Sequence, residues 1–369
     1  MFNFDKKLLK YFDWPLLITT IVISCFGMVT IYVATVNSSS GFFRYLKPQG
    51  AALVLGIFAI ALLLFIDYEF IGKLYIPIYI ITCFLLILVM LIGDEANGAK
   101  SWLVIGSFIR FQPSEIAKIS IIICVGKFID LNKEHINEPL TLIKVLVFSF
   151  FPVALILEND FGTAMVCTFI IAIMLFVAGL NWKYILSAIS VVLLSMPLLW
   201  LKFDEYQQQR ILVFLDPTKD PTGSGYQVLQ AKTAIGSGML FGRGLEDAKF
   251  IKYGYLPENH TDMIFSVIGE VFGFAGGMFL LFLYLVIFYR LIKLARDSKD
   301  LYGSLLNMGI LAMILFHVIE NVGMNMGLMP VTGIPLPFIS YGGTALLSNL
   351  LGVGMALSVG MRRKNLLFD

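Results

Sequence analysis

The segment from Tyr255 to Asp262 reads Tyr-Leu-Pro-Glu-Asn-His-Thr-Asp and places carboxylate, imidazole and hydroxyl groups directly before a long apolar run that starts at Met263. A carboxylate is costly to hold where a chain enters a membrane, and such residues usually have a function. An aspartate in this position can act as a general base that takes a proton from an attacking hydroxyl group. Asp262 is therefore the first candidate catalytic residue. On sequence alone, Asp262 or Thr261 could equally be the N-cap of the next helix.

A glutamate and a lysine lie three residues apart in Gln-Pro-Ser-Glu-Ile-Ala-Lys, residues 112–118. Glu115 and Lys118 can pair on one helix face, and Pro113 suits a first helical turn. A charge at bilayer depth costs at least about 2.5–3.5 kcal/mol, so both must be paired or must face water. The pair is either a structural link between helices or part of a substrate-facing cavity.

Two other polar clusters interrupt apolar sequence. Asp160, which follows Glu158 in a turn, could cap the next helix or could place its carboxylate inward. The apolar run near residue 320 has one polar face that must be shielded from lipid, and hydrogen bonding between helices explains it most simply. That face consists of His317, Glu320, Asn321 and Asn325.

The stretch 327–344, within the dense run from Asn321 to Asn349, cannot form a regular helix, because Pro330, Pro335 and Pro337 interrupt it. Irregular backbone at bilayer depth is tolerated only within protein or beside water. We therefore expect this re-entrant segment to line the same cavity as the loop before Asp262. Four cations of that loop could meet a phosphate-bearing ligand or could be rim charges; they are Arg210, Lys232, Arg243 and Lys249.

The elements that position these residues are predicted from composition and hydropathy. The chain has 369 residues, of which 58% are hydrophobic and 14% charged, and its mean hydropathy is +0.85. These values predict an integral membrane protein, and the net charge of +2 gives no indication of nucleic-acid binding. The four cysteines lie in apolar runs without paired spacing, which favours small apolar side chains over metal ligands or disulfides.

Ten apolar runs are long enough to span a membrane, which takes about 20 residues. The first follows a polar start and is too long for a signal-peptide core, so we expect it to be retained. The fold class is therefore an all-α, polytopic membrane helix bundle of about ten transmembrane helices. The predicted spans are 14–36, 49–66, 74–93, 113–130, 142–157, 161–180, 184–201, 263–292, 304–327 and 342–361.

An even number of spans places both termini on one side, and the lysines and arginines near the span ends choose the side. The terminus side carries Lys6, Lys7, Lys10, Lys73, Lys127, Lys133, Lys144, Lys183, Arg290, Lys293, Arg296, Lys299, Arg362, Arg363 and Lys364. Short loops on the other side carry only Arg44, Lys47, Lys100 and Arg110. We therefore expect both termini to be cytoplasmic, and one long extracellular loop, 202–262, between spans 7 and 8. Within that loop, residues 226–245 suggest amphipathic helix and turn, and we expect the whole chain, 1–369, to be one membrane domain.

Several ordered motifs resemble those of the SEDS family (shape, elongation, division and sporulation). They are Gly98-Ala-Lys-Ser-Trp102, Phe111-Gln-Pro-Ser-Glu-Ile-Ala-Lys118, Asp160-Phe-Gly-Thr163, Arg210 to Pro217, Gly225-Tyr-Gln, Ala234-Ile-Gly-Ser-Gly238, Leu256 to Asp262, and Pro330 to Gly343. The resemblance covers essentially the whole chain in order. The short tails and the start of the first span, Phe12-Asp-Trp-Pro15, look more like the elongation members than the division members.

The resemblance implies a polytopic peptidoglycan glycosyltransferase of the bacterial cytoplasmic membrane, with its active site on the extracytoplasmic side. Such an enzyme polymerises lipid II into β-1,4-linked glycan strands and releases undecaprenyl pyrophosphate. The family's essential aspartate falls on Asp262, its tryptophan on Trp102, and its acid–base pair on Glu115 and Lys118. Family members work with a class B penicillin-binding protein, and an elongation member would also meet other membrane proteins of the elongation complex.

We accordingly predict Asp262 as the catalytic base. Positive charge must stabilise the leaving pyrophosphate, and Lys118, Arg210 and Arg243 are candidates. A divalent cation, Mg²⁺ or Mn²⁺, is an alternative, although the sequence shows no strong metal motif. Trp102, on an outer loop, could stack on a sugar or could anchor the protein at the membrane interface. The predicted substrate-binding set is Trp102, Glu115, Lys118, Asp160, Arg210, Lys232, Arg243, Glu258, His260 and Ser340.

The chain departs from the family pattern at several positions: Met263, Glu158-Asn159, Met239 and Val271. These departures concern fine substrate contacts and leave Asp262 untouched. A flippase for lipid-linked sugars shares the substrate and the helix bundle, but we find no internal repeat of the kind that transporters show. A non-catalytic scaffold for wall synthesis is the third alternative, and a division or sporulation role is the alternative to elongation.

Overall fold

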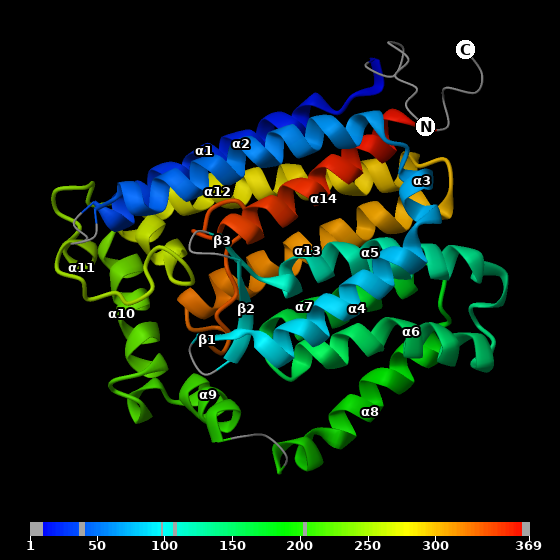
Figure 1. The fold of residues 1–369 in the computed structure, drawn as a ribbon. Coiled ribbons are helices and arrows are strands. Elements are labelled where there is room, and N and C mark those ends of the chain that lie inside the picture. The colour runs from blue at the N-terminus through cyan, green and yellow to red at the C-terminus, as the bar shows by residue number, and fades with distance from the viewer. Residues whose placement is uncertain (1–9, 37–40, 97–98, 106–108, 202–204, 364–369) are drawn as a thin grey trace.

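The computed structural model describes residues 10–36, 41–96, 99–105, 109–201 and 205–363. Ten of the described helices have at least 17 residues, and they run back and forth between the two ends of a bundle (Figure 1). They are α1 (Trp14–Thr35), α2 (Phe43–Phe65), α4 (Tyr75–Ile92), α5 (Pro113–Leu131), α6 (Pro139–Leu157), α7 (Phe161–Val177), α8 (Trp182–Trp200), α12 (Ile264–Asp297), α13 (Leu301–Asn325) and α14 (Gly343–Met361).

Shorter elements connect these helices. Three antiparallel strands form one small sheet in the order β1-β2-β3 at one end of the bundle. The short helices are α3 (Tyr68–Lys73), α9 (Glu205–Leu215), α10 (Ser224–Ser237) and α11 (Lys249–Lys252), with 3-10 turns at Lys133–His135 and Pro217–Lys219. The strands are β1 (Asp94–Ala96), β2 (Ala99–Ile105) and β3 (Ile109–Phe111).

Seven of the described helices are long and apolar enough to cross a membrane: α1, α2, α4, α6, α12, α13 and α14. The other three predicted spans are also helical. Helix α5 is less apolar than the seven, since it carries four charged residues that form two ion pairs, Glu115 with Lys118 and Lys127 with Asp130. The all-α, polytopic membrane architecture predicted from the sequence is confirmed.

The two ends of the bundle differ in what they carry. Arg363 donates a hydrogen bond from Nη2 to the carbonyl of Tyr11 at 2.9 Å, so the first and last described segments meet at one end, which we call the tail end. The opposite end, which carries α9 to α11, is the loop end (Figure 1). At the tail end, Arg290 Nε donates to both oxygens of the buried Asp13 at 2.9 and 3.1 Å, and this pair fixes α12 to α1.

Helix α12 is broken at Gly273, where φ is +67° and ψ is −163°. The segment 238–244 satisfies the backbone groups that the break leaves unpaired. Gly244 N–H donates to the Val271 carbonyl at 3.1 Å, and Phe274 N–H donates to the Met239 carbonyl at 2.8 Å. A Cβ on Gly242 would lie 2.0 Å from the Val271 oxygen, so the approach requires glycine. The span predicted at 263–292 corresponds to α12, and the break at Gly273 was not among the sequence predictions.

The structure corrects the predicted position of Trp102 and locates the predicted helix and turn at 226–245. Trp102 does not lie on a loop but on β2, where it pairs with Asp94 of β1, and its side chain is half-buried. The predicted helix and turn at 226–245 correspond to α10 and the segment that contacts the break in α12. Residues outside the described ranges include Lys6, Lys7 and Lys364, Gly98 of the first motif, and the start of the predicted long loop, 202–204.

Candidate active site

The turn from Glu258 to Met263 presents Asp262 at the loop end, directly before α12. Glu258 adopts a left-handed conformation with φ +51°. Its carbonyl accepts hydrogen bonds from the N–H groups of Thr261 at 3.2 Å and Met263 at 3.1 Å. The turn is therefore closed on itself by backbone hydrogen bonds, and the Asp262 side chain is only partly exposed.

Three consecutive carbonyl groups of this turn are held by other parts of the chain. Tyr341 N–H donates to the His260 carbonyl at 2.8 Å. Ser340 Oγ donates to the Thr261 carbonyl at 2.7 Å. The carbonyl of Asp262 itself accepts from two side chains of α13, Asn321 Nδ2 and Asn325 Nδ2, each at 2.9 Å. The backbone that carries the carboxylate is therefore fixed from two directions.

Both asparagines are fully buried and use their remaining groups in the same region. Asn321 Nδ2 also donates to the Ile334 carbonyl at 2.8 Å. Asn325 Oδ1 accepts from the Ser266 hydroxyl at 2.8 Å, in the first turn of α12. The polar face of the ninth predicted span thus serves hydrogen bonding between segments, as its simplest interpretation predicts. Here that hydrogen bonding positions Asp262.

Gln49, on α2, completes this arrangement and was missed by sequence reasoning. Its Nε2 donates to the Ser340 carbonyl at 3.1 Å, and its Oε1 accepts from Gly342 N–H at 3.0 Å. The side chain is buried, and the two bonds fix the turn from which Ser340 reaches Thr261. A glutamine inside an apolar run was the one available sequence signal.

Gly333 lies against the carboxylate of Asp262. A Cβ built on Gly333 would be 3.4 Å from Asp262 Oδ2, and the glycine has φ +77°. The residues on either side of it are both held by α13: Thr332 Oγ1 donates to Glu320 Oε1 at 2.9 Å, and the Ile334 carbonyl accepts from Asn321. The stretch 332–334 therefore forms a fixed wall beside the carboxylate.

The surroundings of Asp262 disfavour its charged form. Burial raises the pKa of Asp262 from 3.8 to about 7, the negative charges of Glu258 and Asp160 add to this, and the positive charge of Arg210 opposes it. A carboxyl group with a pKa near 7 is suited to general-base chemistry at neutral pH. The structure thus brings four predicted site residues into one electrostatic environment: Asp262, Glu258, Asp160 and Arg210.

Asp160 is the N-cap of α7. Its Oδ1 accepts from Thr163 N–H at 2.9 Å, and its Oδ2 accepts from the Thr163 hydroxyl at 2.7 Å and from Gln112 Nε2 at 3.1 Å. The capping interpretation is confirmed. The bond to Gln112 also ties the start of α7 to the start of α5.

Lys118 lies deep in the bundle. Its Nζ is 2.9 Å from Glu115 Oε1 and 2.9 Å from His317 Nε2, and the lysine is 1% exposed. His317 Nδ1 is 2.7 Å from the Met313 carbonyl, so Nδ1 carries the proton and Nε2 accepts from the lysine. These contacts favour the structural interpretation of the pair over direct contact of Lys118 with a leaving group.

The remaining predicted residues lie around the turn or away from it. The ring of His260 packs edge-on against Tyr45, with ring centroids 4.7 Å apart, and burial lowers the pKa of His260. Lys232 is exposed, and its aliphatic chain lies along Gly327. Arg243 Nε donates to the Ser237 carbonyl at 2.8 Å, beside the break in α12. Among the described residues, no hydrogen bond or ion pair joins Lys232, Arg243 or Trp102 to Asp262.

Metal ligation has no support in the described part of the chain. Within it, no group of three or more His, Cys, Asp or Glu side chains is arranged to hold a metal ion. Asp262 and Glu258 supply carboxylates at the site, but a third protein ligand is not among the described residues beside them.

Comparison with known proteins agrees with this geometry. The model of the FtsW/RodA/SpoVE family of cell cycle proteins matches residues 13–365. A probable peptidoglycan glycosyltransferase FtsW of Geobacter sp. (strain M18) is 34% identical over 364 residues, covering 96% of this chain and 98% of the relative. The peptidoglycan glycosyltransferase MrdB of Escherichia coli (strain K12) is 38% identical over 292 residues, covering 78% of each chain.

Solved structures share the fold. One comes from work on structural coordination of polymerization and crosslinking by a peptidoglycan synthase complex. It has a TM-score of 0.82 and 32% identity, covering 95% of this chain and 97% of that one. The rod shape determining protein RodA of Thermus thermophilus has a TM-score of 0.72 and 30% identity, covering 95% and 97%. The integral membrane protein described here belongs to the FtsW/RodA/SpoVE family of cell cycle proteins, the SEDS family.

Proposed function

We propose that this SEDS-family peptidoglycan glycosyltransferase polymerises lipid II into β-1,4 glycan strands on the outer face of the bacterial cytoplasmic membrane. One observation carries the proposal. Asp262 lies at the loop end, its backbone carbonyl is held by two buried asparagines, and its pKa is raised to about 7. A lipid-tethered sugar must react near the membrane surface, and a carboxylate at the end of a spanning helix lies at that height.

In the proposed reaction, the Asp262 carboxylate takes the proton from the acceptor sugar's hydroxyl as that oxygen attacks the anomeric carbon of the donor. The bond from this carbon to the pyrophosphate oxygen breaks, and undecaprenyl pyrophosphate leaves with the electron pair. Arg210 is the cation whose charge acts on Asp262, so we assign it to the leaving pyrophosphate. The turn holds the Asp262 carboxylate in place for the reaction, because three of the turn's carbonyl groups are fixed by hydrogen bonds before substrate binds.

We also propose a class B penicillin-binding protein as partner. Support comes from the similar structure of a peptidoglycan synthase complex in which polymerization and crosslinking are coordinated. A role in elongation is supported by the sequence features of the first span and by the likeness to RodA. Similar identities to FtsW and MrdB leave division or sporulation as the alternative role.

The two alternative functions, flippase and scaffold, can be distinguished from the enzyme by their expected assay results. A flippase needs two compartments, whereas polymerisation in detergent does not. A scaffold tolerates changes at Asp262. The geometry favours the enzyme, because the structure concentrates buried hydrogen bonds on fixing one carboxylate at one end of the bundle.

The test is polymerisation of fluorescent lipid II by the purified full chain in detergent, with and without the class B partner. We expect glycan strands from the wild type, none from Asp262→Asn, and normal strands from Asp247→Asn, which changes an exposed aspartate elsewhere in the same loop. Strands made by Asp262→Asn at the wild-type rate would contradict the proposed mechanism. Absence of strands from the wild type with every partner tried would contradict the enzyme itself.

A further inference from the structure

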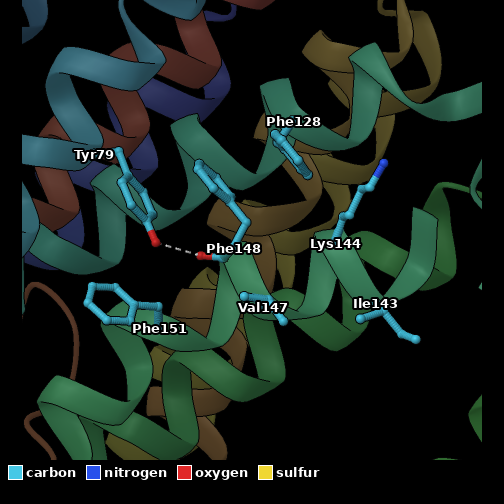
Figure 2. Close-up of a pocket in the computed structure, with 7 residues that line it drawn as sticks. All are labelled: Tyr79, Phe128, Ile143, Lys144, Val147, Phe148 and Phe151. Carbon is cyan, nitrogen blue, oxygen red and sulfur yellow. Dashed lines mark hydrogen bonds between the residues drawn. The ribbon is translucent and has the colours of Figure 1, made fainter. Parts of the chain in front are cut away.

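A groove of about 460 Å³ lies between α4, α5 and α6, on the side of the bundle that faces lipid (Figure 2). Apolar side chains of α6 form its open side, and Ile143, Val147 and Phe151 are each at least half exposed. None of the residues of the candidate active site lines it. The lining residues are Tyr79, Phe128, Ile143, Lys144, Val147, Phe148 and Phe151.

The floor of the groove is an ordered stack of aromatic rings. The Phe148 ring lies between those of Tyr79 and Phe128, with centroid distances of 4.2 and 4.4 Å and interplanar angles of 15° and 14°. Pro152 has no N–H, so the Phe148 carbonyl lacks its usual helical partner. The hydroxyl of Tyr79 donates to that carbonyl at 2.9 Å instead, as Figure 2 shows. The shape of the groove is therefore fixed by specific bonds.

The groove lies in the tail-end half of the bundle. Tyr79 is near the start of α4, Phe128 is in the last turn of α5, and Lys144 is in the second turn of α6. Phe151 is farther along α6, about 10 Å deeper at 1.5 Å per residue. The groove therefore runs from the tail-end membrane surface towards the middle of the bilayer, whereas Asp262 lies at the loop end.

Lys144 supplies one uncommitted positive charge at the shallow end of the groove. It is exposed, and it makes no hydrogen bond or ion pair with the described residues. Its neighbour on α5, Lys127, is by contrast paired with Asp130 at 2.8 Å. Figure 2 shows the Lys144 amine at the opposite end of the groove from Phe151. The groove thus combines a slot for hydrocarbon with a cation at headgroup depth.

We propose that this groove binds one anionic phospholipid of the tail-end leaflet. An acyl chain lies over Phe148 between Lys144 and Phe151, and the phosphate pairs with the Lys144 ammonium group. Basic sites between transmembrane helices on the cytoplasmic side bind acidic lipid headgroups in this way. Because α5 forms one wall and carries Glu115 and Lys118 farther along, the bound lipid fixes α6 against the helix that holds this pair.

The test measures binding of single lipids to the full-length, delipidated protein in detergent by native mass spectrometry. The probes are phosphatidylglycerol and phosphatidylcholine. We expect phosphatidylglycerol to bind more tightly, and Lys144→Gln to weaken it about fivefold, the effect of one lysine near an anionic lipid. Lys183→Gln is the matched control, because Lys183 is an exposed tail-end lysine outside the groove. Val147→Trp, which fills the groove, should abolish retention of the lipid.

Two results would overturn the proposal. One is equal binding of the two lipids to the wild type together with unchanged binding to Lys144→Gln. The other is a photo-crosslinker at position 147 that reacts in cells with a polypeptide rather than with lipid, which would make the groove a helix-docking site. Melting temperatures of the lipid-free variants, expected to match the wild type, show that each variant is folded.

Discussion

Gly333 faces the carboxylate of Asp262: a Cβ built on the glycine would lie 3.4 Å from the aspartate's Oδ2. The glycine belongs to a segment held on both sides by α13, and the aspartate belongs to a turn whose carbonyl is held by the same helix. Helix α13 therefore sets the distance between the carboxylate and the wall beside it. In the proposed reaction the acceptor hydroxyl must approach this carboxylate, and a side chain at position 333 would occupy space beside Oδ2.

Gly333→Ala should reduce polymerisation, because the added methyl group would lie against Oδ2 and crowd the acceptor hydroxyl. The loss should approach about a hundredfold where the acceptor is displaced by about 1 Å. The control is Gly179→Ala. Gly179 also has positive φ, at +86°, but a Cβ there would meet nothing within 4 Å. Both variants should lose a similar amount of stability from backbone strain, and only Gly333→Ala should lose activity. Equal activity of the two variants would show that Gly333 matters only for its backbone conformation.

Replacing Asn325 with leucine should lower both stability and activity. The change removes one of the two donors to the Asp262 carbonyl and the side-chain oxygen that accepts from the Ser266 hydroxyl, which keeps only its bond to the Met263 carbonyl. Each lost hydrogen bond contributes about 0.5–1.5 kcal/mol. Asn307→Leu is the matched control, because Asn307 is also fully buried on α13 and bonds only locally, to the Gly303 carbonyl at 3.1 Å and to Ser298. Both variants should melt at lower temperature. If activity per folded molecule falls equally in both, the asparagine does not position Asp262.

The rate of polymerisation should rise as pH increases through about 7, since Asp262 accepts a proton only when it is charged and its pKa is raised to about 7. Glu258→Gln removes a negative charge that raises this pKa, so the rise should move to lower pH. Arg210→Gln removes the charge that lowers it, so the rise should move to higher pH. The measurement is the initial rate against pH for the three proteins. Shifts in the opposite directions would exclude Asp262 as the titrating base.

The same pKa makes a prediction about stability. Because the pKa of Asp262 is higher in the folded protein than its ordinary value of 3.8, the folded state holds a proton that the unfolded state releases. Its contribution to stability should therefore decline as pH rises from about 4 to about 7, and should be constant above that. Asp262→Asn should lack this decline, and melting curves in detergent across that pH range will test it. A decline of equal size in the variant would assign it to other groups.

Gly242→Ala should strongly destabilise the protein, since its Cβ would lie 2.0 Å from the Val271 oxygen at the break in α12. Gly244→Ala is the matched control two residues away. It has φ +68°, and a Cβ there would meet nothing within 4 Å. Thermal melting should separate the two variants clearly. Similar melting temperatures would mean that the loop does not need to approach α12 so closely.

The sequence was sufficient for those features that depend on local chemistry. The apolar runs predicted the helices, and the exceptional position of Asp262 predicted its candidate role. The capping of α7 by Asp160 was one of the two interpretations that residue type and spacing allowed. The polar face of α13 was recognised, but its target, the Asp262 carbonyl, could not be inferred because the partner lies 59 positions earlier in the chain for Asn321.

Features that depend on distant partners were not predictable. The strands around Trp102 are short and interrupted by glycine, and only their pairing with one another makes them a sheet. Gln49 looked like one polar residue in an apolar run, because its partners at Ser340 and Gly342 follow some 290 positions later. The break at Gly273 leaves hydropathy unchanged, and the N–H and carbonyl groups that stabilise it belong to a preceding loop.

The break at Gly273 divides α12 into a short half that follows Asp262 and a longer tail-end half. Ion pairs of Arg290 with Asp13 and of Arg363 with Asp297 attach its tail-end half to α1 and α14. The segment 238–244 bonds both sides of the break, at Val271 and at Phe274. A partner that displaced this segment would therefore act on α12 at the point where the helix can bend, and the short half that leads back to Asp262 could change its angle while the ion pairs hold the tail-end half in place.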